Sequence, residues 1–277
     1  MNLFTSALVV LVTLAVIAWL VIRPERINRP GRLVPRQRRL VIRALPWWQK
    51  LDGRRRARLL GQVARLQQDI TLVSGDGFTP DESQRMAVLG HIAIASLAPD
   101  INPHWLPDEI VIYGGPIDAS ETALPHDMIE DLGELATGES WASERLAVSW
   151  PQVARAARGS GPENPLIRGL AAWRMRQLMV DSDRHASWIA AYQAAYDRWA
   201  RDPRGPTRQL LRQIEPGGDP DTELPRFVGA AAEAFFQRGP ELARILPGVY
   251  DLMATGFDFD TARRAPAGHR TPRVTPE

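Results

Sequence analysis

The feature that most constrains this chain is a run of twenty residues without a charged side chain, Leu3–Ile22. Only Thr5, Ser6 and Thr13 within it are polar. As an α-helix the run would be about 30 Å long, which matches the hydrocarbon core of a bilayer. A secretory signal peptide is the alternative, but no Lys or Arg precedes the run and no A-x-A cleavage site ends it. The sequence therefore predicts an uncleaved transmembrane anchor over residues 1–22.

Basic residues are concentrated directly after this run. Residues 1–58 carry 13 basic and 2 acidic side chains, whereas residues 59–277 carry 21 basic and 30 acidic side chains. Because basic flanks stay on the cytoplasmic side, the pattern predicts a single-pass protein of the cell membrane with its globular domain in the cytoplasm. An acidic body repels a phosphate backbone, so nucleic acid is not an expected partner.

The segment 23–44 is predicted to be a basic juxtamembrane tether. Three prolines and a glycine between residues 24 and 35 disfavour a helix, so we expect an extended chain. The apolar patch around Trp47 and Trp48 has two interpretations: it rests on anionic lipid of the inner membrane, or it packs on the first helix of the domain. The residues predicted to contact the membrane are Trp19, Arg23, Arg26, Arg29, Trp47 and Trp48.

Residues 45–257 are predicted to form one mainly helical α+β domain. Two helices are expected before any strand, and the acidic stretch between the two expected strands is predicted to be a loop or an edge hairpin. Residues 258–277 contain three prolines and few apolar side chains, which indicates a disordered tail. The expected helices are Arg54–Asp69, Thr79–Leu97 with a capping box at its start, Asn164–Val180, Trp188–Ala200, Glu223–Gln237 and Pro240–Ala254, and the expected strands are Glu109–Tyr113 and Leu146–Trp150.

The helix expected at Asn164–Val180 carries the most informative side chains. Its first two residues, asparagine and proline, suit the N-cap and the first helical position, and apolar residues recur at spacings of three and four. On one face, Arg168 and Ala172 stand one turn apart, with Gly169 beside the first of them. This is the spacing of an HExxH motif in which every reactive group is replaced.

The order of segments resembles the glucose-regulated zinc metallopeptidase family typified by Mlc titration factor A. The resemblance covers about Leu45–Phe257 and rests on five segments: LLGQVARLQQDITLVSGDGF, TPDESQR, EIVIYGG, GESWASERLAVSW and AAAEAFF. It implies a zincin-like scaffold related to that of thermolysin-like enzymes. In such a scaffold two histidines and a glutamate bind zinc, and a second glutamate activates water.

This chain departs from the family at those positions. The resemblance places Arg168 and Ala172 at the two histidines, Gly169 at the catalytic glutamate and Arg226 at the third zinc ligand. A guanidinium has no acceptor, and glycine and alanine have no polar side chain, so none of the four can bind zinc or act as a general base. We therefore expect a divergent member with no catalytic residue, no metal ligand and no cofactor, although the family implies zinc.

The five histidines offer no replacement for the missing ligands, because no two of them are spaced as a ligand pair. His91 is expected in the core, and His104 and His126 at the surface. His185 is expected at the entry of a helix, and His269 in the tail.

The predicted function is binding, in a regulatory or scaffold role, rather than catalysis. If the family's scaffold is kept, Arg168 and Arg226 point toward one place and require negative charge between them. Glu223 and Glu233 can supply that charge internally, or an acidic ligand or partner protein binds there. The competing interpretation is an active zinc-dependent peptidase with non-standard ligands.

Overall fold

The structure of the protein is a computed structural model. It describes residues 32–97, 106–115, 117, 139–142, 145–161, 163–180, 182–201, 205–211 and 220–262. The chain divides into two units, Met1–Arg32 and Leu33–Glu277, and the fold below is that of the second. Within the described ranges no helix is long and apolar enough to cross a membrane. The predicted anchor and its flanking contact residues, Trp19, Arg23, Arg26 and Arg29, lie outside those ranges.

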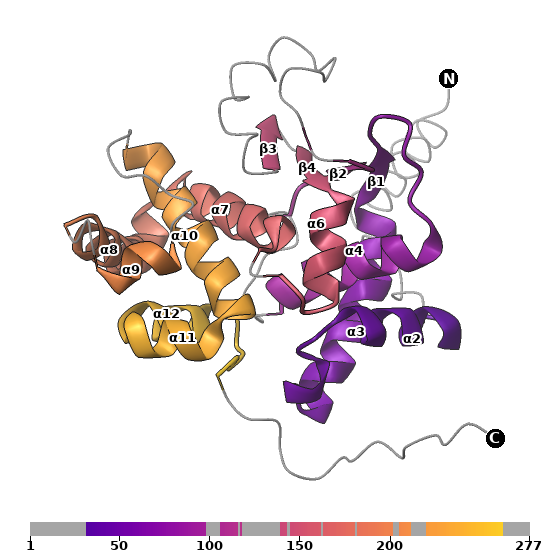
Figure 1. The fold of residues 1–277 in the computed structure, drawn as a ribbon, viewed down its shortest axis with the longest axis horizontal. Coiled ribbons are helices and arrows are strands. Elements are labelled where there is room, and N and C mark those ends of the chain that lie inside the picture. The colour runs from indigo at the N-terminus through magenta and orange to yellow at the C-terminus, as the bar shows by residue number, and fades with distance from the viewer. Residues whose placement is uncertain are drawn as a thin grey trace, which may run out of the picture. The chain divides into compact units, whose positions relative to one another are not determined.

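Helices make up most of the described part of this unit, and together with a small sheet they confirm a mainly helical α+β fold. Figure 1 shows α7 and α10 side by side, and these two helices share an extensive contact. In chain order the helices are α2 (Pro35–Ala44), the 3-10 helix η1 (Trp48–Lys50), α3 (Gly53–Asp69), α4 (Glu82–Ala95), α6 (Trp150–Ala157), α7 (Pro165–Val180), α8 (Ser182–Ala200), α9 (Pro206–Leu210), α10 (Pro220–Gln237), α11 (Gly239–Ile245) and α12 (Pro247–Gly256).

The sheet has four strands in the order β1-β2-β4-β3. β1 (Thr71–Ser74) and β2 (Glu109–Tyr113) are parallel, as are β2 and β4 (Arg145–Ser149), whereas β3 (Glu139–Ala142) is antiparallel to β4. Both α6 and α7 contact β4. The central strands are consequently apolar, because parallel strands are covered by helices. Ile110, Ile112, Leu146 and Val148 are fully buried.

Several predicted elements have the expected positions. The strand β2 and the helix α3 agree with the sequence prediction to within a residue, and α7 begins directly after Asn164 as expected. The end of the stretch predicted to be a loop or an edge hairpin is the strand β3, antiparallel to β4, and most of the stretch before it lies outside the described ranges. These elements carry their own local signals, namely caps, a proline at the first position and alternating or periodic apolar residues.

The N-terminal part of the domain differs from the prediction in two ways. Pro35–Ala44, which we expected to be an extended part of the tether, is the helix α2, because Pro35 occupies the first turn, where proline is tolerated. The strand β1 precedes α4, so the prediction that two helices would come before any strand missed one strand and one helix. The N-cap of α4 is Asp81, rather than Thr79: its carboxylate accepts from the Gln84 N–H at 2.8 Å, and Gln84 Oε1 accepts from the Asp81 N–H at 2.7 Å.

Prolines also mark the differences in the C-terminal part. The predicted helix Pro240–Ala254 is two helices, α11 and α12, because Pro247 has no N–H to continue the first and opens the second. Helix α6 was not predicted; Pro151 lies in its first turn rather than after a strand. α10 includes Pro225 and begins before the predicted start.

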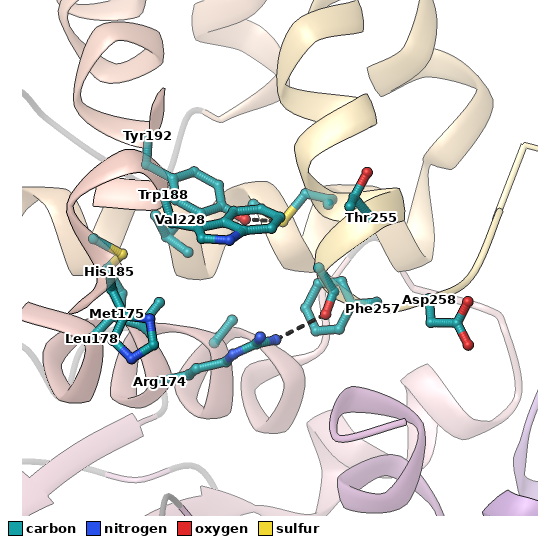
Figure 2. A pocket seen from close by; sticks show the side chains of 13 residues that line it. Arg174, Met175, Leu178, His185, Trp188, Tyr192, Val228, Thr255, Phe257 and Asp258 are labelled. Atoms are coloured by element: carbon teal, nitrogen blue, oxygen red, sulfur yellow. Dashed lines mark hydrogen bonds between the residues drawn. The ribbon is translucent and has the colours of Figure 1, made fainter. Parts of the chain in front are cut away.

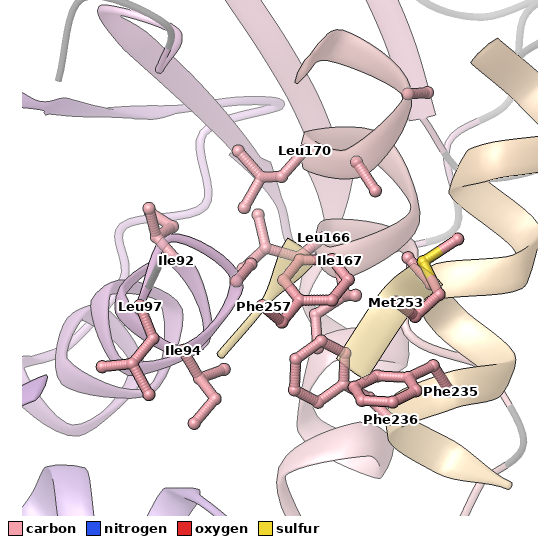
Figure 3. Packing of buried hydrophobic residues seen from close by; sticks show 14 of the residues in the cluster. Ile92, Ile94, Leu97, Leu166, Ile167, Leu170, Phe235, Phe236, Met253 and Phe257 are labelled. Carbon is pink, nitrogen blue, oxygen red and sulfur yellow. The ribbon is translucent and has the colours of Figure 1, made fainter. Parts of the chain in front are cut away.

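The core lies where α4, α7, α10 and α12 meet, and Figure 3 shows its side chains. Burying one such large apolar side chain contributes about 1.5–3 kcal/mol. The packing of α7 against α10 is therefore a major part of the folding free energy, and it fixes the face of α7 that the sequence analysis singled out. Labelled members of the cluster are Ile92, Ile94, Leu97, Leu166, Ile167, Leu170, Phe235, Phe236, Met253 and Phe257.

Candidate functional site

The predicted site face of α7 lies directly against α10. Asn164 caps α7: its Oδ1 accepts a hydrogen bond from the Ile167 N–H at 3.2 Å. A Cβ atom added to Gly229 on α10 would lie 2.7 Å from the carbonyl oxygen of Arg168 and 3.3 Å from Cβ of Ala172. Only glycine permits such a close approach, so the two helices cross at the predicted metal positions.

Arg168 is buried in this crossing, where it pairs with Glu233 of α10. Nη1 of Arg168 lies 3.3 Å from Oε2 and 3.5 Å from Oε1 of Glu233. The two side chains are 7% and 2% exposed. Glu233 Oε1 also accepts a hydrogen bond from the backbone N–H of Asn164. The pair therefore links the start of α7 to the middle of α10.

The electrostatics of Glu233 reflect this burial. Loss of solvent raises the pKa of its carboxyl group above the ordinary value, while the charge of Arg168 and the N–H of Asn164 oppose the rise. The carboxylate depends on both partners for its stabilisation, because an unpaired buried charge costs several kcal/mol.

Arg226 lies nearer the surface and pairs with a different carboxylate. Its Nη1 is 3.5 Å from Oε1 of Glu223, one turn earlier on α10. The side chain of Arg226 is 39% exposed, whereas that of Glu223 is 3% exposed. Arg226, Gly229 and Glu233 are spaced three and four residues apart, so they share one face of α10.

The two predicted binding arginines are thus each neutralised from within the protein. Glu233 and Glu223 are the carboxylates that the internal interpretation named. Binding of an external anion by the two arginines stays a prediction. Arg226 keeps enough exposure to reach an acidic partner.

The residues at the predicted metal positions do not fit a zinc ion. Zinc requires lone pairs from imidazole, thiolate or carboxylate. Arg168 brings a cation, Gly169 and Ala172 bring no polar side chain, and the carboxylate of Glu233 is paired with Arg168. Within the described part of the chain, no cluster of three or more His, Cys, Asp or Glu side chains could hold a metal.

His91 has the core position that the sequence predicts. It is fully buried, its Nδ1 lies 2.8 Å from the carbonyl oxygen of Ala87, and burial lowers its pKa to about 4. His185 lies in the first turn of α8, as expected for a helix entry. His104, His126 and residues 263–277 of the predicted tail, with His269, lie outside the described ranges. The first five residues of that predicted tail, 258–262, are part of the domain, because Phe259 and Thr261 are buried in it.

Trp47 and Trp48 belong to the core rather than to a lipid-facing surface. They are 4% and 8% exposed, and the Trp47 Nε1–H donates to the carbonyl of Phe236 at 2.7 Å. The guanidinium of Arg56 on α3 lies 5.4 Å from the Trp48 ring centroid. Trp48 therefore packs beside α3, the helix that the packing interpretation named, whereas Trp47 packs against α10 and α4. The predicted membrane contact of these two side chains is wrong because both are buried in the core.

A cavity of about 270 Å³ lies beside α7, and the sequence analysis did not predict it. Figure 2 shows its lining, with Trp188 and Tyr192 on one wall and Arg174 and His185 facing them. The walls come from α7, α8, α10 and the end of α12, which are separated by up to about 80 residues in sequence. A cavity with walls from such distant segments cannot be predicted from a local pattern. The one related sequence feature was the aromatic stripe of the predicted helix at Trp188–Ala200.

The chain matches the family model of the glucose-regulated metallo-peptidase M90 over residues 19–170, which is more than half of its length. The match ends inside α7, after Arg168 and Gly169. A search of curated proteins finds no match.

Proposed function

The chain belongs to the glucose-regulated metallopeptidase family M90, and we propose that it uses the family's domain for binding rather than for peptide hydrolysis. The observation that carries this proposal is the buried ion pair between Arg168 and Glu233. In a zinc peptidase the metal polarises the substrate carbonyl and a nearby base activates water. Here a guanidinium, which repels a dication, occupies the first ligand position.

The role of Glu233 supports the same conclusion. Both of its oxygens lie within 3.5 Å of Arg168 Nη1, and one of them also accepts the N–H of Asn164. Binding of zinc by this carboxylate would have to compete with its buried ion pair to Arg168. The alternative, an active peptidase with non-standard ligands, requires a ligand set outside the described residues.

We further propose that Leu3–Ile22 holds the domain at the cytoplasmic face of the cell membrane. The charge asymmetry of the sequence supports this placement. Helix α2, a short distance after the anchor in sequence, adds support because all four of its basic side chains are exposed and would be attracted to anionic lipid. The exposed arginines of this helix are Arg36, Arg38, Arg39 and Arg43.

A peptidase assay tests the proposal. The full-length protein is incubated with an unfolded protein substrate, with added zinc and with a zinc chelator in parallel. We expect no cleavage under either condition, since no ligand or base is available at the family's positions. Cleavage that the chelator abolishes would instead establish the active-peptidase alternative.

A further inference from the structure

The cavity beside α7 is large enough for a bicyclic ring and is lined mainly by apolar and aromatic side chains. Its volume of about 270 Å³ exceeds the roughly 150 Å³ of a cavity that accommodates benzene. The rings of Trp188 and Tyr192 are stacked, with centroids 6.2 Å apart and an angle of 29° between their planes. Met175 and Met253 contribute thioethers that adapt to the shape of an aromatic guest.

Two hydrogen-bond donors converge at one end of this cavity, near Gly256. The guanidinium of Arg174 donates to the Gly256 carbonyl at 3.0 Å. A Cβ atom added to Gly256 would lie 3.6 Å from the hydroxyl of Tyr192. That hydroxyl, on a side chain that is 6% exposed, donates to the thioether of Met253 at 4.0 Å, and sulfur is a weak acceptor.

Arg174 brings a positive charge to this end. Burial raises the pKa of Tyr192 to about 12, and the nearby charge of Arg174 opposes part of this rise. The hydroxyl therefore remains a donor at neutral pH. Asp258 is the acidic residue of the lining, but its carboxylate binds Arg55 at 2.7 Å and Arg58 at 3.2 Å. In Figure 2 the Asp258 carboxylate points away from Arg174.

Gly256 keeps the end of the cavity open. It is the last residue of α12, and its added Cβ would also lie 4.0 Å from Cζ3 of Trp188. These are ordinary contact distances, so a side chain at this position fits the backbone but extends toward the space between the two rings. A larger side chain at residue 256 would therefore fill the cavity.

We propose that this cavity binds a small aromatic carboxylate. The ring lies against Trp188 among the apolar side chains, and the carboxylate accepts hydrogen bonds from Arg174 and from the Tyr192 hydroxyl. A carboxylate suits a guanidinium and a hydroxyl donor better than a neutral oxygen does, because charge-assisted hydrogen bonds are stronger. The lining does not include Arg168, Ala172 or Arg226, so the proposal is independent of whether the protein hydrolyses peptides.

Calorimetric titration of the full-length protein with 1-naphthoate tests the proposal. The neutral analogue 1-naphthalenemethanol, which has the same ring, is the matched ligand. We expect saturable one-to-one binding of 1-naphthoate, and binding of the alcohol that is about tenfold weaker or more. Absence of saturation by about 5 mM 1-naphthoate, or equal affinities for the two ligands, would overturn the proposal.

Two variants locate the binding in the cavity. Gly256→Leu should abolish binding by filling the space, and Arg174→Met should weaken 1-naphthoate by about tenfold and remove the preference for the carboxylate. Asp251→Asn, at an exposed position of α12, is the control and should bind as the wild type does. Thermal melting shows which variants fold, and either folded variant is sufficient to test the site. Wild-type affinity for 1-naphthoate in Gly256→Leu would contradict the site. An unchanged preference for the carboxylate over the alcohol in Arg174→Met would contradict it as well.

Discussion

Replacing Arg168 by methionine breaks the ion pair at the crossing of α7 and α10 while keeping most of the volume of the side chain. At an effective dielectric constant of about 20, two unit charges 3.3 Å apart attract each other by about 5 kcal/mol. Both side chains are almost fully buried, so the Glu233 carboxylate would lose its ion-pair partner and keep only the weaker support of the Asn164 N–H and of more distant charge. We expect Arg168→Met to lower the free energy of unfolding by about 3–5 kcal/mol at neutral pH.

The loss of unfolding free energy in Arg168→Met should depend on pH, because it depends on whether Glu233 is protonated. Burial already raises the pKa of Glu233, and removal of Arg168 removes a cause that lowers it. The folded variant then holds this proton more tightly than the unfolded chain does, so its stability falls as pH rises from the unfolded pKa through the folded pKa. The destabilisation should therefore be larger near pH 8 than near pH 5.

The matched control for this prediction is the double variant Arg168→Met with Glu233→Leu, which removes both charges. Replacing a whole buried pair with apolar residues is often neutral, so we expect the double variant to recover most of the stability. Urea unfolding followed by circular dichroism measures all three proteins. A loss below about 1 kcal/mol in the single variant, or no recovery in the double variant, would refute the reasoning.

Four other predictions concern the helix crossing, Trp47, the membrane topology and the lipid contact of α2. Gly229→Ala should lower the free energy of unfolding by about 1–3 kcal/mol because its Cβ meets the Arg168 carbonyl. The control is Gly61→Ala on α3, where the added Cβ meets nothing within 4 Å, and it should be neutral or stabilising. Urea unfolding compares the two variants. Trp47→Phe removes the hydrogen bond to Phe236 and should lower the free energy of unfolding by about 1 kcal/mol, without changing the binding of anionic vesicles. A reporter fused at Thr271 should be active only if the reporter works in the cytoplasm, and activity of a periplasmic reporter would contradict the proposed topology. Glutamine in place of the exposed arginines of α2 should weaken vesicle binding by about 1 kcal/mol for each residue that lies near the lipid, namely Arg36, Arg38, Arg39 and Arg43.

Local signals account for what the sequence predicted correctly. Helix α7 has an asparagine cap, a proline in its first position and apolar residues at helical spacing, and each of these acts within a few residues. Strand β1 has only four residues and is stabilised by its pairing with β2, about 38 residues later, so periodicity could not identify it. Helix α2 was missed because its proline was interpreted as a helix breaker rather than as a first-turn residue.

In the candidate site, too, residue types can be read from the sequence, whereas the contacts between distant segments cannot. The prediction that Arg168, Gly169 and Ala172 stand at the HExxH positions came from the order of the resembling segments, and the family model matches the chain through residue 170. Which glutamate neutralises which arginine depends on how α7 crosses α10 at Gly229, and that geometry is set by tertiary packing. The burial of Trp47 likewise depends on the approach of Phe236, which is 189 residues away in sequence.

The zinc content of the full-length protein tests the central claim most directly. The protein is purified without a histidine tag, dialysed against buffer with micromolar zinc, freed of unbound metal and measured by mass spectrometry. The account predicts less than about a tenth of an equivalent of zinc per chain, because a guanidinium, a glycine and an alanine stand where the ligands and base would be. Close to one equivalent of tightly bound zinc would contradict it.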